Sequence, residues 1–268
     1  DNRLLSLFLV KEKMTDAVIF GPDGVNLQPS ELLYKKNILA IRGSFRPVTK
    51  VNIDMIRNGY TKFVLEKRVK KENLQVLFEI TLSNLIAEGE IDEEDFLARA
   101  DILCSIGQTV LISNYQQYYK LLDYFGKFTT KRMGIILGVP NLKQIFEEKY
   151  YRHLSGGILE AFGRMFNRDL KVYLYPYQKQ KDGELTISTN LQVHPRFRPL
   201  FDYLLYNNRI VDIIKMEPTK DLVVKGWIRS FRANRFIALN DGSCMSSLQI
   251  VIDPDHFDKE IIKVSHKN

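Results

Sequence analysis

The chain has 268 residues, of which 45% are hydrophobic and 26% are charged, and it carries a formal net charge of +7. These proportions are typical of a globular protein with one large or two ordinary domains. Every apolar run is too short to cross a bilayer as a helix, so we expect no membrane partner. With only two cysteines, Cys104 and Cys244, we expect neither a disulfide framework nor a metal site, no cofactor, and a cytoplasmic location.

The opening residues 1–10 are apolar but lack a signal-sequence cleavage site, which favours a buried strand or a helix end. Between residues 38 and 213, short apolar runs predict buried strands over 38–41, 109–113, 133–139 and 170–175. Apolar spacings of three and four predict helices over 51–66, 74–87, 92–102, 115–128, 140–148, 158–166 and 197–207. This alternation predicts an α/β fold for residues 1–213, with a mostly parallel sheet and helices on both faces.

The pattern changes after residue 213. A polar turn over 178–184 predicts an edge hairpin before that point, and compact β spacing begins at Lys215. We therefore predict two domains, an α/β domain over 1–213 and a small partial β-barrel over 214–268. The sequence leaves open whether the parallel sheet is doubly wound or part of a larger barrel.

Near the C-terminus, basic residues alternate with aromatic rings in a strand-like context. The basic residues are Lys225, Arg229, Arg232 and Arg235, and the rings are Trp227, Phe231 and Phe236. Cations attract phosphates and rings stack on bases, so this combination is typical of a surface for single-stranded nucleic acid. A core position for Trp227 or Phe236, and a merely solvated strand position for Gln249, remain alternatives.

Three stretches of this segment carry a resemblance: VKGWIR (224–229), FIALNDGS (236–243) and LQIVID (248–253). Residues 211–263 resemble the N-terminal anticodon-binding OB-fold of bacterial asparaginyl-tRNA synthetase, and residues 210–214 resemble the short helix that precedes this barrel. The resemblance implies that tRNA or other single-stranded RNA is the partner. It also implies that Phe236 stacks on an anticodon base, that Gln249 reads the central uridine, and that Arg232 contacts the anticodon. Arg229 and Lys225 are then expected to contact phosphates.

The same comparison of motifs sets limits on activity. The barrel of the synthetase continues for further strands, and residues 264–268 do not follow its pattern. The chain lacks the motif arginines and the amino-acid pocket of a class II catalytic domain, so we expect RNA binding without aminoacylation. Whether the chain is an enzyme of another kind stays open.

The larger domain carries a second resemblance, on RGSFRPVT (42–49), LISNY (111–115), GVPNL (138–142) and GGILEAFGR (156–164). Residues 30–209 resemble a bacterial family often labelled TonB-dependent receptor or nicotinamide/nicotinate-nucleotide adenylyltransferase. Neither label fits the residues. An outer-membrane receptor needs a long β-barrel, and the four histidines form no His-x-Gly-His pair.

Polar residues nonetheless follow the predicted strands. Arg42, Ser44 and Arg46 come after the first, and Ser113 and Asn114 come after the second. Ligands of an open parallel sheet lie beyond the carboxyl ends of its strands, and arginines with hydroxyls suit an anion. This pattern predicts a site for a phosphorylated small molecule, although loops that only cap helices are the alternative.

Two other features have structural interpretations. His153 is a candidate acid/base only if it lines that cleft. The cations of residues 62–71 are expected to form a solvated helix face, and the excess charge of residues 1–214, +5, looks diffuse. Three functions remain: an RNA-binding protein, an enzyme or binding protein for a phosphorylated or nucleotide ligand with an incidental OB-like tail, and a structural adaptor.

Overall fold

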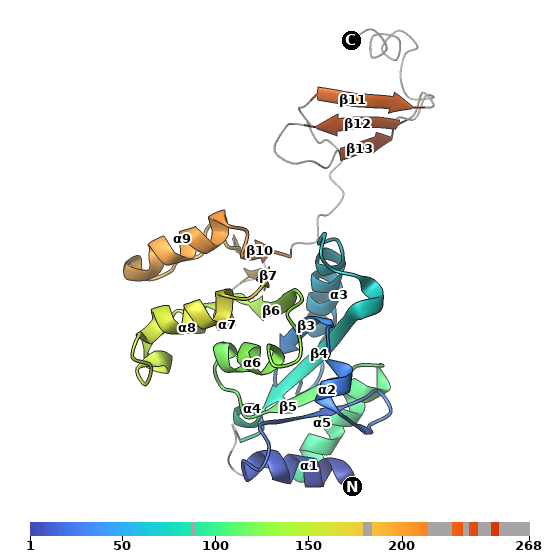
Figure 1. Cartoon of the computed structure of the whole chain (residues 1–268), viewed down its shortest axis with the longest axis vertical. Coiled ribbons are helices and arrows are strands. Elements are labelled where there is room, and N and C mark those ends of the chain that lie inside the picture. The colour runs from blue at the N-terminus through green and yellow to red at the C-terminus, as the bar shows by residue number, and fades with distance from the viewer. Residues whose placement is uncertain are drawn as a thin grey trace. The chain divides into compact units, whose positions relative to one another are not determined.

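The computed structural model describes residues 1–86, 89, 91–178 and 184–213, and the backbone of three further strands between residues 227 and 251 (Figure 1). The chain divides into two compact units, Asp1–Lys215 and Met216–Asn268. Within the described residues, no helix combines the length and the apolar character needed to span a membrane.

The first unit is built on an eight-stranded sheet with the order β10-β7-β6-β3-β4-β5-β1-β2. The strands are β1 (Ala17–Phe20), β2 (Asn26–Leu27), β3 (Asn37–Arg42), β4 (Leu74–Thr81), β5 (Val110–Ser113), β6 (Met133–Gly138), β7 (Leu170–Tyr175) and β10 (Ile210–Asp212). The six strands from β10 to β5 are parallel, and β1 pairs antiparallel with both β5 and β2. The predicted α/β class with a mostly parallel sheet is confirmed.

The strand order shows how the parallel sheet is wound. The first parallel strand, β3, lies in the middle; β4 and β5 extend the sheet on one side, and β6, β7 and β10 extend it on the other. This is the doubly wound order, so the sheet is open rather than part of a larger barrel. The strand order reverses between β3 and β6, which makes this position the topological switch point of the sheet. In open parallel sheets, ligands bind at such a point, outside the carboxyl ends of the strands.

Helices cover both faces of this sheet (Figure 1). They are α1 (Asn2–Lys11), α2 (Pro29–Leu32), α3 (Lys50–Val64), α4 (Leu82–Ile86), α5 (Glu93–Ser105), α6 (Tyr118–Phe125), α7 (Val139–Ile145), α8 (Gly157–Phe166) and α9 (Arg198–Tyr206). Short 3-10 helices span Lys71–Asn73, Glu148–Tyr151 and Pro195–Phe197. Residues of α6 to α9 belong to one buried cluster, and residues of α1, α3, α4 and α5 belong to the other.

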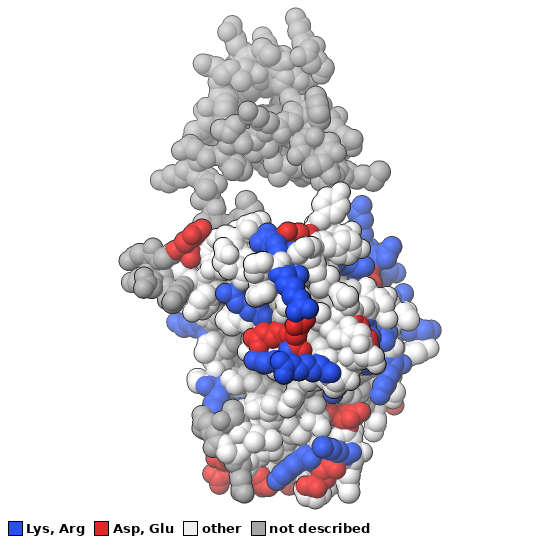
Figure 2. Space-filling view, turned by 90° about the vertical axis from the view of Figure 1, so that its left-hand side faces the viewer, with Lys and Arg blue, Asp and Glu red and all other residues white. Residues whose placement is uncertain are grey.

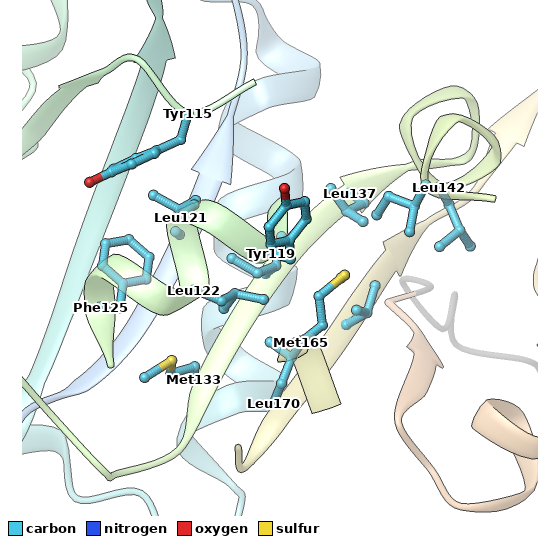
Figure 3. Close-up of a cluster of buried hydrophobic side chains, with 14 of the residues drawn as sticks. Tyr115, Tyr119, Leu121, Leu122, Phe125, Met133, Leu137, Leu142, Met165 and Leu170 are labelled. Atoms are coloured by element: carbon cyan, nitrogen blue, oxygen red, sulfur yellow. The ribbon is translucent and has the colours of Figure 1, made fainter. Parts of the chain in front are cut away.

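Figure 3 shows part of the first cluster. Leu121, Leu122 and Phe125 of α6 lie beside Met133 of β6, and Met165 of α8 lies close to Leu170 of β7. The helix boundaries follow their caps: Asp92 accepts hydrogen bonds from the first turn of α5, and Thr49 forms a capping box with Asn52 at the start of α3. These local signals explain why most predicted helices are found near their predicted positions.

One predicted helix, residues 74–87, is wrong. Leu74–Thr81 is strand β4, between β3 and β5, and only Leu82–Ile86 is helical. The strand is central and its last five residues are all buried, so its apolar residues do not alternate with polar ones. A short apolar run without period-two alternation is ambiguous between strand and helix, and here the packing decides.

A second correction concerns residues 210–214, which resemble the short helix before the synthetase barrel. Ile210–Asp212 is instead strand β10, paired in parallel with Val172–Leu174 of β7. Its main-chain groups complete the edge of the large sheet. The predicted hairpin is present as a separate two-stranded sheet, β8 (Tyr177–Gln178) and β9 (Leu185–Thr186).

The second unit contains a three-stranded antiparallel sheet with the order β11-β12-β13. Its strands are β11 (Trp227–Arg232), β12 (Phe236–Asn240) and β13 (Leu248–Val251). The β-rich character of this segment agrees with the sequence pattern. Its assignment to a partial barrel of the OB type remains a prediction.

Candidate functional site

The register of the small sheet determines which predicted RNA-binding positions are neighbours. Arg232 of β11 pairs with Phe236 of β12, which pairs in turn with Val251 of β13. In the next row on the same face, Gln249 of β13 pairs with Ala238. Positions two apart on a strand share a face, so Arg232, Phe236 and Gln249 occupy adjacent rows of one face. Diagonal positions of this kind are about 7–8 Å apart.

The opposite face of the small sheet has a different composition. The register assigns it Ile228, Phe231, Ile237, Leu239, Leu248 and Ile250, all of them apolar. A half-buried antiparallel sheet normally turns its apolar positions toward a core and leaves the other set at a surface. The face that carries Phe236 also holds Trp227, Ala238 and Val251 beside polar positions, so a surface position for Phe236 stays a prediction.

The two predicted phosphate contacts are placed less regularly. The register of β11 with β12 shifts between Ile228 and Ser230, which makes Arg229 the extra residue of a bulge. Bulges locally increase the twist of a strand and redirect the bulged residue. Regular period-two alternation, which would put Arg229 on the same face as Trp227, is therefore interrupted at this point. Lys225 lies outside the described residues.

At the carboxyl edge of the large sheet, the structure brings Arg42 and Ser113 together on a third residue, Glu79 of β4. The Arg42 Nε and Nη2 atoms donate to the two carboxylate oxygens at 2.8 and 2.9 Å, and the Ser113 hydroxyl donates to Oε1 at 2.6 Å. Glu79 is fully buried. Burial opposes the charged form of Arg42, but the neighbouring carboxylate outweighs it and raises the pKa of the guanidinium.

Arg42 is held from two other sides. Its Nη1 donates to the main-chain oxygen of Gln116 at 2.8 Å, and its guanidinium lies 4.2 Å from the centre of the Tyr118 ring. Burial raises the pKa of Tyr118 to about 12, against the opposing effect of Arg42. The guanidinium therefore has a carboxylate, a carbonyl and an aromatic ring as partners within the protein, which together satisfy a buried cation.

The other predicted anion-binding residues contact other parts of the protein. The Arg46 side chain pairs with Asp95 of α5 at 3.0 Å, and the main-chain oxygen of Ser44 accepts a hydrogen bond from Arg99. The main-chain N–H of Asn114 donates to the main-chain oxygen of Asp16. The predicted set is thus divided between an Arg42–Ser113 cluster on Glu79 and an Arg46–Asp95 pair, and each arginine faces a carboxylate.

A pocket of about 270 Å³ lies beside this cluster. It is lined by Ser83, Gln116, Gln117, Tyr118, Gln144, Ile145, Tyr150 and Tyr151. These described lining residues are uncharged, and they offer amides and phenolic hydroxyls as hydrogen-bonding groups. His153 is absent from this lining; its Nε2 is hydrogen-bonded to the Tyr119 hydroxyl at 2.8 Å. The condition for an acid/base role of His153 in the cleft is therefore unmet.

The sequence interpretation missed a basic groove of about 700 Å³, which we call the amino-edge groove. Its lining consists of Lys62, Leu65, Glu66, Lys67, Arg68, Arg132, Asp169, Leu170, Lys171, Asn207, Asn208 and Arg209. It lies after the C-terminal end of α3 and where β6, β7 and β10 begin. One signal was available in the sequence: Arg132 and Arg209 each stand directly before one of these strands, and Lys171 is the second residue of β7.

Comparison with known proteins finds no family model that matches the chain. A segment is similar to the asparagine–tRNA ligase of Bacteroides fragilis, with 46% identity over 59 residues, 20% of this chain and 13% of the ligase. The ligase of Geotalea uraniireducens is 52% identical over 40 residues, which are 14% and 9% of the two chains. That of Clostridium tetani is 56% identical over 45 residues, which are 15% and 10%.

The matched segment spans about a tenth of the length of these ligases. The resemblance to asparaginyl-tRNA synthetases is thus supported for a segment of the chain. The labels TonB-dependent receptor and nucleotide adenylyltransferase receive no support from these comparisons. A short segment of this chain is thus similar to asparagine–tRNA ligases.

Proposed function

We propose that this protein binds RNA, with tRNA as the preferred form, through the face of the small sheet that carries Arg232, Phe236 and Gln249. The observation that carries the proposal is the register, which sets these three positions in adjacent rows. The similarity of a segment to asparagine–tRNA ligases supports the choice of tRNA.

Each of the three residues has a chemistry suited to one part of an unpaired nucleotide. A guanidinium attracts a phosphate, and a base stacked on an aromatic ring contributes about 1–3 kcal/mol. A glutamine amide has an acceptor beside a donor, which matches the N3–H group and the carbonyl oxygens of uracil. Together they favour a single-stranded loop with a uridine, such as an anticodon with a central U.

Aminoacylation is not part of the proposal. The matched segment is about a tenth of a ligase, and the larger unit is built on a doubly wound parallel sheet. We infer that binding, rather than chemistry on the tRNA, is the role of the small sheet.

The test measures the affinity of the full chain for tRNA with a central anticodon uridine, and for the same tRNA with that base replaced. Phe236→Ala should weaken binding about 5- to 150-fold, the equivalent of losing one stacked base, and Phe236→Trp should retain it. Gln249→Ala should remove the preference for uridine. Asn240→Ala, on the same face of β12, serves as the matched control.

Equal binding of all RNAs by the parent protein, or identical affinities for Phe236→Ala and Asn240→Ala, would refute the assigned roles. An intact far-ultraviolet circular dichroism spectrum of each variant separates a lost contact from a lost fold.

A second candidate function, small-molecule binding at the carboxyl edge of the large sheet, is favoured by the doubly wound strand order. The pocket next to Tyr118 is the place for such a ligand. Because its described lining is uncharged and Glu79 balances Arg42, we propose that it accepts a polar, uncharged group rather than a phosphate. Thermal-shift measurements on nucleosides and their 5′-phosphates test this: a larger shift with the phosphates would contradict it.

A further inference from the structure

The amino-edge groove collects most of the excess charge of the larger unit. Residues 1–214 hold 30 Lys and Arg and 25 Asp and Glu, a net charge of +5. The groove lining holds six of these cations and two of the acids, a net charge of +4. In the middle and lower part of the face drawn in Figure 2, basic and acidic residues lie next to one another. The excess that looked diffuse in the sequence is therefore concentrated at one place.

Three of the six cations have no acidic partner among the described residues. The Lys62 Nζ atom donates to the main-chain oxygen of Asp212, and the Arg209 guanidinium donates to the main-chain oxygens of Arg168 and Leu170. Lys67 is exposed and, in the part of the chain that the structure describes, has neither an ion pair nor a side-chain hydrogen bond. Their charges are available to a ligand.

The other three cations are held in position by the two acids. Glu66 pairs with both Arg132 and Lys171, and Asp169 pairs with Arg132 and with Arg68. Each acid therefore pairs with two cations, and the network of three cations and two acids keeps a net positive charge. Arg132 and Lys171 are half-buried and held by these ion pairs, so this part of the lining is positioned before a ligand binds.

The lining also indicates which kind of anion fits. Its apolar residues are Leu65 and Leu170, and the described lining includes no aromatic ring. A nucleotide site needs a surface on which the base is buried or stacked, whereas a groove of cations and amides, such as those of Asn207 and Asn208, contacts phosphates alone. The volume of about 700 Å³ leaves room for more than one phosphate.

We propose that the amino-edge groove binds the phosphate backbone of RNA without regard to base sequence. The inference takes from the proposed function only that RNA is the polyanion; the charge and the geometry of the groove are independent of the small sheet. The protein then has two RNA contacts of different kinds: a sequence-independent one on the α/β unit and a base-reading one on β11–β13.

The test uses the full chain and labelled tRNA at salt concentrations from about 50 to 200 mM. In the triple variant Lys62→Gln, Lys67→Gln, Arg209→Gln, the slope of log Kobs against log salt should become shallower by about 2 to 3, since each lost phosphate contact removes about 0.7–0.9. The conservative triple Lys62→Arg, Lys67→Arg, Arg209→Lys should keep the parent slope. Lys11→Gln, Lys120→Gln, Lys143→Gln, which changes three exposed lysines elsewhere, is the matched control.

Equal slopes for the groove triple and the control triple would overturn the inference. A second result would also overturn it. Inorganic tripolyphosphate would raise the melting temperature of the parent protein but not that of the groove triple, while the groove triple keeps the parent slope with tRNA. The groove would then bind small anions only. Phe236→Ala, Gln249→Ala separates the two proposals. If the double variant leaves tRNA affinity unchanged while the groove triple flattens the slope, the assignment of the small sheet fails and that of the groove stands. If the double variant weakens tRNA binding while the groove triple keeps the parent slope, only the assignment of the groove fails.

Discussion

The Arg42 guanidinium donates to both carboxylate oxygens of Glu79, at 2.8 and 2.9 Å, although the two residues are 37 positions apart in the sequence. They meet because β3 and β4 are parallel neighbours, in which Arg42 pairs directly with Glu79. The anion that Arg42 binds in this structure is therefore a side chain of the protein itself. A bidentate pair of this kind combines charge with directional hydrogen bonds.

Removing the carboxylate should be costly. Glu79→Ala leaves a largely buried guanidinium without its charge partner, and we expect the free energy of unfolding to fall by about 3–5 kcal/mol in urea denaturation. The exposed pair of Glu147 with Lys149 is the control: Glu147→Ala should change stability by less than about 1 kcal/mol. Similar losses in the two variants would show that the buried pair contributes no more than a surface pair.

The same pair makes a prediction about ligands. In the parent protein, phosphate should give no shift of melting temperature that depends on Arg42. Glu79→Gln removes the negative charge while keeping the shape, so phosphate should stabilise this variant more than the parent, and the added Arg42→Ala should abolish the gain. A phosphate response of the parent that disappears in Arg42→Ala alone would instead support the anion site predicted from the sequence.

Two helical glycines should respond to alanine in opposite directions. A Cβ at Gly59 of α3 would stand 2.8 Å from Cγ1 of the buried Ile136, so Gly59→Ala should destabilise by about 1–3 kcal/mol. A Cβ at Gly163 of α8 meets no described atom within 4 Å, and the gain in helix propensity should stabilise by up to about 1 kcal/mol. Thermal denaturation of the two variants measures both signs, and equal signs would contradict the packing of α3 on β6.

The hydroxyl of Tyr124 is buried and has no hydrogen-bond partner among the described residues. Tyr124→Phe removes the desolvated group and should raise the free energy of unfolding by about 1 kcal/mol. The matched change, Tyr119→Phe, removes the hydrogen bond with His153 and should lower it by a similar amount. Chemical denaturation of both variants decides: a destabilised Tyr124→Phe would indicate that the hydroxyl has a partner after all.

Alkaline pH should unfold the larger unit together with ionisation of its tyrosines. Burial raises the pKa of Tyr118, of Tyr124 and of Tyr175 to about 12. Unfolding returns these phenols to a pKa of about 10, so the folded state holds more protons between these values and loses stability as the pH rises from about 10 to 12. Tyrosinate absorbance and circular dichroism should change together. Tyr124→Phe should flatten the decline, and a decline of unchanged steepness would contradict this assignment.

Most of the fold was predictable from local patterns. The two exceptions, β4 and residues 210–212, are strands because of their neighbours in the large sheet. Asp92 and Thr49 mark the starts of α5 and α3, because caps act within one turn. The central strand β4 was missed since both of its faces are covered, which leaves no periodicity to detect. The segment 210–212 is a strand because a neighbouring strand, β7, supplies its hydrogen bonds.

The candidate sites divide along the same line. Alternation along β13 is a local property, so the sequence alone separated Gln249 from its apolar neighbours Leu248 and Ile250. The partners of Arg42 and Arg46 depend on which strands and helices are adjacent. The sequence around these two arginines therefore did not indicate that Glu79 and Asp95 would pair with them.

The sequence by itself determined the α/β class, most helices and the alternation along β13, because these depend on interactions within a few residues. Only the tertiary structure decided the winding of the large sheet, the neutralisation of Arg42, and the groove in which Lys62, Arg132 and Arg209 come together. Charges far apart in a sequence reinforce or cancel one another only when the fold brings them within a few ångströms, since solvent screens them at longer range.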